Sequence, residues 1–135
     1  MSTAALAGPG IAVLALTEPL PGFPGYRDYA LVPAGEGGLV FWLQAVAAVG
    51  PRFLVVPSAP YFPDYAPSLP PAVAAELGLD GADAELYCLV SVPDGDVGPA
   101  TANLRAPLVV NPATSAARQV VLADGRYPIR RPLRR

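Results

Sequence analysis

Proline is the feature of this sequence that most constrains its fold. The chain has 18 prolines in 135 residues, and six of them fall in the run PSAPYFPDYAPSLPP, from Pro57 to Pro71. Proline has no backbone N–H and a fixed φ, so it interrupts helices and is confined to edges and bulges of sheets. We therefore expect this run to form neither a helix nor a central strand.

The same run carries three aromatic side chains and one charge, all in the segment YFPDY. Two interpretations are open. In the first, the aromatic side chains fold back as a lid, with Phe62 and one tyrosine closing the mouth of the core. In the second, Tyr61, Phe62, Asp64 and Tyr65 form part of a partner surface, because prolines pre-order a loop and aromatic residues are common in interfaces.

Outside this run, short segments rich in β-branched and aromatic residues, bounded by glycine and proline, predict strands. The expected strands are Ile11–Leu16, Tyr29–Val32, Leu39–Leu43, Arg52–Val56, Glu85–Val92, Thr101–Leu104, Leu108–Val110 and Arg118–Leu122. We expect Thr101–Leu104 and Leu108–Val110 to pair around the bend at Pro107. A proline near the start and a glycine just past the end predict one short helix of two turns, which begins near Pro71 and ends before Gly78.

This pattern predicts an all-β, mainly antiparallel fold: a small barrel-like or sandwich domain of about seven or eight short strands with one short helix. With no repeat or linker, residues 1–135 are expected to form a single domain, and residues 126–135 an arginine-rich C-terminal tail for which flexibility is left open. The longest strongly apolar stretch, Ala4–Leu16, is interrupted by glycine and proline and is too short to span a bilayer. We expect a cytoplasmic protein with no membrane contact.

Residues that carry chemistry are scarce. The chain has one cysteine, Cys88, and no histidine, which removes the commonest general base and metal ligand. Cys88 lies within an expected strand, so we expect a buried structural thiol. Asp94 and Asp96 alternate like the start of a calcium loop but lie in the turn PDGDVG without a closing glutamate, which favours a solvated turn. We expect no catalytic residue, no cofactor and no metal.

The net charge of −2 conceals a segregation of charge along the chain. Between Phe53 and Leu104 there are seven acidic residues and no basic one, and from Arg118 to Arg135 there are six arginines against one acid. The acidic section either collects in solvated loops or attracts a basic partner. An isoelectric point near 4.9 argues against the broad basic face that phosphate binding needs, so we expect no direct nucleic-acid contact.

Three further side chains have two possible environments each. Phe41 and Trp42 lie on opposite faces of one expected strand, so one of them belongs to the core, and the only tryptophan of a small domain is most often a core residue. Asn103 is a polar residue in an expected strand. It either bonds the backbone of a partner or satisfies a local bend before Pro107.

Several stretches together resemble one family, the FliW flagellar assembly factors. They are PGFPGY (21–26), FWLQ (41–44), FLVV (53–56), YFPDY (61–65), LGL (77–79), VSVP (90–93), TANLRAPLVVN (101–111), QVVL (119–122) and YPIRRPL (127–133). They follow the order and spacing of the family over nearly the whole chain, and FPDY, NLRAPLVVN and YPIR together are specific to it.

The resemblance implies a compact, barrel-like all-β protein that is cytoplasmic and not an enzyme. It also implies two partners: flagellin, the filament subunit, and CsrA, a small basic RNA-binding repressor of translation. In the implied partner switch, accumulating flagellin occupies the protein. Once flagellin is secreted, the freed protein sequesters CsrA or antagonises it allosterically, away from its RNA site.

For this function we expect six partner-binding residues: Tyr61, Phe62, Asp64, Tyr65, Asn103 and Arg105. From the residues alone, a second class of function is open, in which a small β-barrel with an apolar interior binds a small-molecule ligand. A third class, an RNA-binding barrel, is disfavoured by the acidity of the chain.

Overall fold

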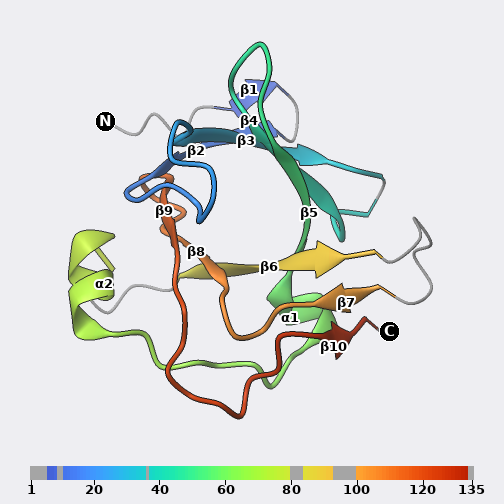
Figure 1. The fold of residues 1–135 in the computed structure, drawn as a ribbon, viewed down its shortest axis with the longest axis vertical. Helices are drawn as coiled ribbons and strands as arrows, with labels where there is room; N and C mark the ends of the chain where they lie inside the picture. The colour runs from blue at the N-terminus through green and yellow to red at the C-terminus, as the bar shows by residue number, and fades with distance from the viewer. Residues whose placement is uncertain (1–5, 9–10, 36, 80–83, 93–99, 134–135) are drawn as a thin grey trace.

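The computed structural model describes residues 6–8, 11–35, 37–79, 84–92 and 100–133, and within these ranges it contains ten strands and two short helices (Figure 1). The strands are β1 (Leu6–Gly8), β2 (Ile11–Leu16), β3 (Asp28–Pro33), β4 (Phe41–Ala45), β5 (Arg52–Pro57), β6 (Glu85–Ser91), β7 (Thr101–Ala102), β8 (Leu108–Val110), β9 (Ala116–Gln119) and β10 (Arg131–Pro132). The helices are α1 (Ser58–Tyr61) and α2 (Pro71–Glu76).

Seven of these strands close into a barrel. The sheet runs β6-β5-β4-β3-β2-β9-β8, and β8 pairs back to β6. Every pairing around the ring is antiparallel except that of β9 with β2, which is parallel, with Leu16 opposite Ala117. The expectation of an all-β, mainly antiparallel barrel is confirmed.

Strand β6 has two successive partners along one edge. Its N-terminal half pairs with β8, with Tyr87 opposite Leu108, and its C-terminal half pairs with β7, with Val90 opposite Ala102. The expected pairing between β7 and β8 is therefore wrong. Both lie along β6 as one interrupted antiparallel strand, because residues 103–107 form a compact turn that shifts the register between them. Strand β10 adds to the outer edge of β7, and β1 adds to β2.

Several strand boundaries differ from the expected ones. Strand β4 begins and ends two residues later than predicted, because Ala45 packs in the core opposite Tyr29. Strand β7 keeps only two of its four predicted residues. Strand β9 begins at Ala116 and ends before Val120, whose N–H donates to the carbonyl of Pro107 (2.9 Å) in the compact turn.

Alternation along the strands fills the barrel interior with apolar side chains. Phe41 and Leu43 of β4 point inward, whereas Trp42 points outward, so Phe41 is the core member of the pair and the general preference of tryptophan for the core does not hold here. The pleat allows only one face of β4 to enter the core, and Leu43 and Ala45 share the inward face with Phe41. The buried members of this interior cluster are Leu14, Leu16, Leu20, Tyr29, Leu31, Leu43, Ala45, Val55, Leu108, Val110 and Ala117.

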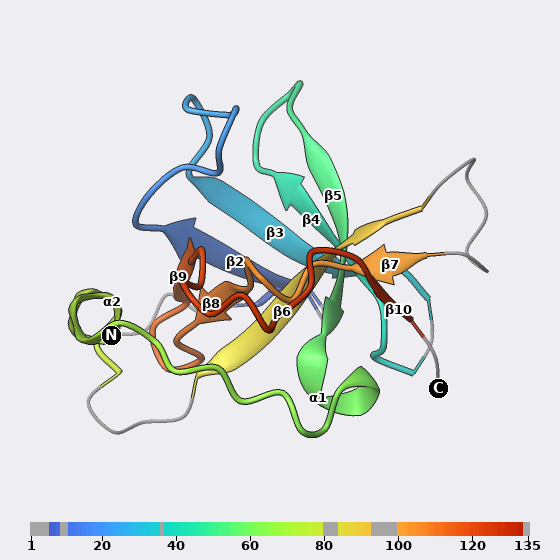
Figure 2. The same ribbon diagram turned by 60° about the horizontal axis from the view of Figure 1, so that its bottom comes forward.

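Two outer clusters cover parts of the barrel wall. Val73 of α2 and Leu77, the C-cap residue that follows it, pack against Val109, Val120 and Leu122. On another part of the wall, Phe62 packs on Val56 and on the outward side chains of β6. The segment between α1 and α2 runs beside the C-terminal segment, as Figures 1 and 2 show.

Helix α1 contradicts the expectation that the proline-rich run holds no helix. It is a single turn with Pro57 at its N-cap, and Pro60 lies within its first turn. The first N–H groups of a helix have no intrahelical acceptor, so proline loses no hydrogen bond at these positions. Helix α2 confirms the predicted start at Pro71, and Gly78 follows its end with φ = 71°.

Candidate functional site

The YFPDY segment folds back from α1 onto the outside of the barrel. Phe62 is 7% exposed and packs with Val56 and Cys88. Its N–H donates to the carbonyl of Ser58 (2.7 Å) and closes the C-terminus of α1. Phe62 is therefore a covering residue, as the first interpretation proposes, but it covers the outer face of β5 and β6 rather than the barrel mouth.

Both tyrosines of the segment use their hydroxyl groups to bind backbone. The Tyr65 hydroxyl donates to the carbonyl of Leu104 (2.6 Å), and the Tyr61 hydroxyl donates to the carbonyl of Leu39 (3.2 Å). The Tyr65 ring meets the Tyr127 ring edge-on, with 5.2 Å between centroids. Burial, with smaller contributions from Cys88 and Tyr127, raises the pKa of Tyr65 far above its ordinary value, so the hydroxyl stays a donor.

Asn103 and Arg105 hold the turn between β7 and β8. The Asn103 Oδ1 accepts hydrogen bonds from the backbone N–H groups of Arg105 (2.9 Å) and Ala106 (3.1 Å). Arg105 Nε donates to the carbonyl of Tyr127 (2.6 Å), and its Nη2 donates to that of Gly125 (3.2 Å). Asn103 therefore satisfies a local bend, and Arg105 ties the C-terminal segment to the barrel. That either also touches a partner stays a prediction.

Four of the six predicted residues meet at one surface hollow of about 250 Å³, which we term the aromatic hollow. It is lined by Tyr61, Phe62, Pro63, Asp64, Tyr65, Leu104, Arg126, Tyr127, Pro128 and Arg131. The guanidinium of Arg131 lies 5.2 Å from the Phe62 ring centroid, and Asp64 is exposed at the rim. The hollow offers aromatic edges and charges of both signs, which suits contact with another protein.

The acidic middle section is distributed over separate elements. Asp64 lies in the YFPDY segment, Glu76 on α2 and Glu85 at the start of β6. The remaining acids of this section lie outside the described residues: Asp80, Asp83, Asp94 and Asp96. The predicted turn with Asp94 and Asp96 stays untested for the same reason.

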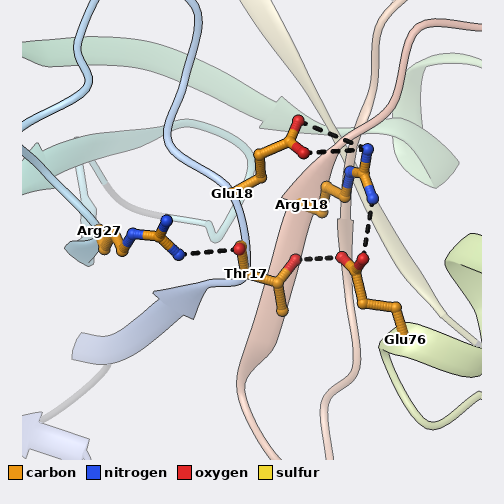
Figure 3. A network of polar contacts seen from close by, with 5 residues as sticks. All are labelled: Thr17, Glu18, Arg27, Glu76 and Arg118. Carbon is orange, nitrogen blue, oxygen red and sulfur yellow. Dashed lines mark hydrogen bonds and ion pairs between the residues drawn. The ribbon is translucent and has the colours of Figure 1, made fainter.

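Glu76 takes part in a polar network that holds α2 to the barrel (Figure 3). Arg118 of β9 reaches Glu76 through Nη1 (2.9 Å) and Glu18 through Nη2 (3.3 Å). The Thr17 hydroxyl donates to the other oxygen of Glu76, and Arg27 donates to the Thr17 carbonyl (2.8 Å). The hydrogen bond from Thr17, followed by those from Arg118, lowers the pKa of the Glu76 carboxyl, although partial desolvation opposes this.

Cys88 is fully buried on the outer side of β6, as the sequence predicts for a structural thiol. Burial raises its pKa to about 12, which keeps the sulfur protonated and a poor nucleophile. No group of three or more metal-ligating side chains occurs among the residues that the structure describes. In the same ranges, no helix is long and apolar enough to cross a membrane.

Sequence reasoning missed the contribution of the C-terminal segment to this site. Tyr127, Arg126 and Arg131 line the aromatic hollow although they lie more than 60 positions after Tyr65 in the printed sequence. Sequence reasoning also missed that the outer face of β4–β6 is apolar. The sequence does indicate this, because β5 and β6 carry apolar residues on both faces, a pattern that is typical of strands buried from two sides.

The comparisons with known proteins agree with this architecture. The model of the FliW protein family matches residues 6–133. A flagellar assembly factor FliW of Moorella thermoacetica is 36% identical over 122 residues, which are 90% of this chain and 77% of that protein. One from Symbiobacterium thermophilum is 40% identical over 114 residues, which are 83% of this chain and 82% of that protein.

A solved structure shows the same fold. The crystal structure of the flagellar assembly factor FliW superposes with a TM-score of 0.78 at 26% identity, and covers 91% of this chain and 86% of that one. The family model extends from β1 to the residue after β10. It therefore includes the barrel and both segments that line the aromatic hollow, the YFPDY segment and the C-terminal segment. This chain belongs to the FliW family.

Proposed function

We propose that this protein is a non-enzymatic flagellar assembly factor that binds flagellin and CsrA in turn. While flagellin accumulates, it occupies the protein. When flagellin has been secreted, the freed protein binds CsrA and antagonises it, which couples flagellin translation to filament assembly. The observation that carries this proposal is the family match over residues 6–133.

The barrel interior supports a function on the outer surface. The side chains of the interior cluster occupy the space that a small ligand would need, and four of them are fully buried: Tyr29, Leu43, Val55 and Leu108. The alternative of a ligand-binding lumen therefore has no support from the interior of the barrel. The aromatic hollow is the surface that we propose for partner contact, since it gathers Tyr61, Asp64 and Tyr65 with the C-terminal arginines.

The test is a competition experiment with purified proteins. Flagellin and CsrA of the source organism are each titrated into the full chain by calorimetry, and CsrA is then titrated into the complex with flagellin. We expect both to bind alone, and we expect saturating flagellin to weaken CsrA binding by at least about tenfold. Absence of binding to both proteins contradicts the proposal, and simultaneous binding without mutual weakening contradicts the partner switch.

A further inference from the structure

The outer faces of β4, β5 and β6 form an apolar groove that borders the aromatic hollow at Tyr61. Trp42 is directly opposite Leu54 in the register, and both point away from the interior. A hollow of about 600 Å³ lies over them, and its lining includes Val56, Val90 and Leu133. We term this surface, together with the hollow beside it, the outer groove.

The adjoining hollow has a volume of about 420 Å³ and shares Leu54 and Val90 with the first, so that the two lie side by side. It adds Ile129, which is 54% exposed, and the arginines Arg52 and Arg130. Ser91 and Asn103 also line this second hollow, so it combines apolar and polar side chains.

Among the described residues that line the two hollows of the outer groove, the charged side chains are Arg52 and Arg130, and both are positive. The guanidinium of Arg52 lies 4.2 Å from the Trp42 ring centroid, which holds this charge at the edge of the apolar floor. Carboxylates beside the apolar side chains of a partner would therefore complement the charge of the groove and favour binding.

The outer groove lies over strands that are already paired in the barrel. Strand β5 pairs with β4 from Arg52 to Val55 and with β6 from Val55 to Pro57, and β6 pairs with β7 at Val90 and Ser91. A partner that binds through side chains needs no further backbone pairing from these strands. An amphipathic helix satisfies its own backbone and presents apolar residues on one face, with charged residues flanking them.

We propose that the outer groove binds an amphipathic helix of a protein partner whose apolar face is flanked by glutamate and aspartate. The apolar side chains enter the hollows over Leu54 and Val90, and the carboxylates pair with Arg52 and Arg130. This inference goes beyond the proposed function, because it stands whether or not the helix belongs to flagellin or CsrA.

The experiment uses the full chain and two synthetic helical peptides of about 18 residues, or five turns, that lack tryptophan. The peptides share one leucine and phenylalanine face and differ only in flanking residues, which are glutamate in one and lysine in the other. Trp42 is the only tryptophan of the chain, so its fluorescence reports binding in the groove. We expect the glutamate peptide to shift this emission and to bind at least about tenfold more tightly than the lysine peptide.

Charge reversal makes the test specific. The double variant Arg52→Glu with Arg130→Glu should prefer the lysine peptide, whereas Arg27→Glu, an exposed arginine outside both hollows, should keep the original preference.

Ile129→Asp should weaken binding of the glutamate peptide at least about fivefold. Its matched control is Val121→Asp, because Val121 is 71% exposed and lines neither hollow.

Each contrary result overturns the proposal. For the unsubstituted protein, these results are that neither peptide binds up to about 1 mM, or that both bind with equal affinity. For the variants, they are that the charge-reversed protein still prefers the glutamate peptide, or that Ile129→Asp and Val121→Asp weaken binding equally. Circular dichroism of each variant shows that the barrel is folded before binding is measured. A failure here leaves the flagellin and CsrA titrations unaffected, so the two proposals are judged separately.

Discussion

The Tyr65 hydroxyl donates a 2.6 Å hydrogen bond to the carbonyl of Leu104, which lies 39 positions later in the chain. This bond fastens the proline-rich loop to the turn between β7 and β8. The loop is therefore a structural part of the barrel wall as well as the rim of the aromatic hollow. A substitution in the loop can act on stability and on partner contact, and the two effects must be measured separately.

Tyr65→Phe removes this hydrogen bond and keeps the ring. We expect it to lower the free energy of unfolding by about 1 kcal/mol, because the Leu104 carbonyl loses its partner in a half-buried place. Urea denaturation followed by circular dichroism measures the change. Tyr26→Phe is the matched control and should cost less, since its hydroxyl makes a longer bond of 3.3 Å to the Val49 carbonyl at an exposed site. Equal losses in both variants would contradict the structural role of Tyr65.

Tyr65→Ala separates structure from recognition. It removes the ring that contacts Tyr127 as well as the hydroxyl, so we expect a clear loss of stability and, if the aromatic hollow binds CsrA, a loss of affinity in the fraction that remains folded. Calorimetry with CsrA under conditions where the variant is folded measures this. Normal affinity in that fraction would show that the segment is structural only.

Asn111→Ala should release the C-terminus of α2. The Asn111 amide is buried and donates to the carbonyl of Leu77 (2.7 Å), and its Oδ1 accepts from the N–H of Ala113. Removing the Asn111 side chain leaves the buried carbonyl of Leu77 without this donor, which should lower the free energy of unfolding by about 2 kcal/mol. Hydrogen exchange of the amides of α2 should accelerate more than that of β3. A uniform acceleration would show that α2 does not open separately.

The stability of the protein should depend on the ionisation of Glu76. Its pKa in the folded protein is lowered below the ordinary value of 4.5, so the network stabilises the fold above that pH and this contribution is lost as the pH falls through the lowered pKa. Glu76→Gln should therefore lower the urea midpoint at neutral pH, and the difference from the unsubstituted protein should shrink at low pH. A constant difference at both pH values would contradict this linkage.

Cys88 should react only when the barrel opens. Its thiol is fully buried and its pKa is raised to about 12, so little thiolate exists at neutral pH. We expect a thiol reagent to modify the native protein orders of magnitude more slowly than it modifies the protein in denaturant. A native rate close to that of free cysteine would place Cys88 at the surface.

Association with CsrA should slow as salt is added. The acidic middle section retains exposed carboxylates, including Asp64 and Glu85, and long-range attraction of a basic partner is screened by ions. Stopped-flow association rates at rising ionic strength measure this effect. A rate that does not change from low to high salt would contradict electrostatic attraction by these acids.

The sequence by itself determined the class of fold, the positions of most strands and the start of α2. These depend on local signals: β-branched runs, turn residues and a proline at a helix start act over a few neighbours. The hydrogen bonds of Asn103 are predictable in the same way, because they reach only two or three residues along the chain. The burial of Cys88 is also predictable from the local sequence, because its neighbours in the strand are apolar.

The tertiary structure alone decided which strands meet and which face of each strand lies inside. Alternation defines two faces of β4 but does not say that Phe41 enters the core and Trp42 the outer groove; that depends on packing with the rest of the barrel. The two partners of β6 and the bond from Tyr65 to Leu104 are likewise long-range. Local sequence cannot specify them, because their stability arises only when distant segments are brought together by closure of the barrel.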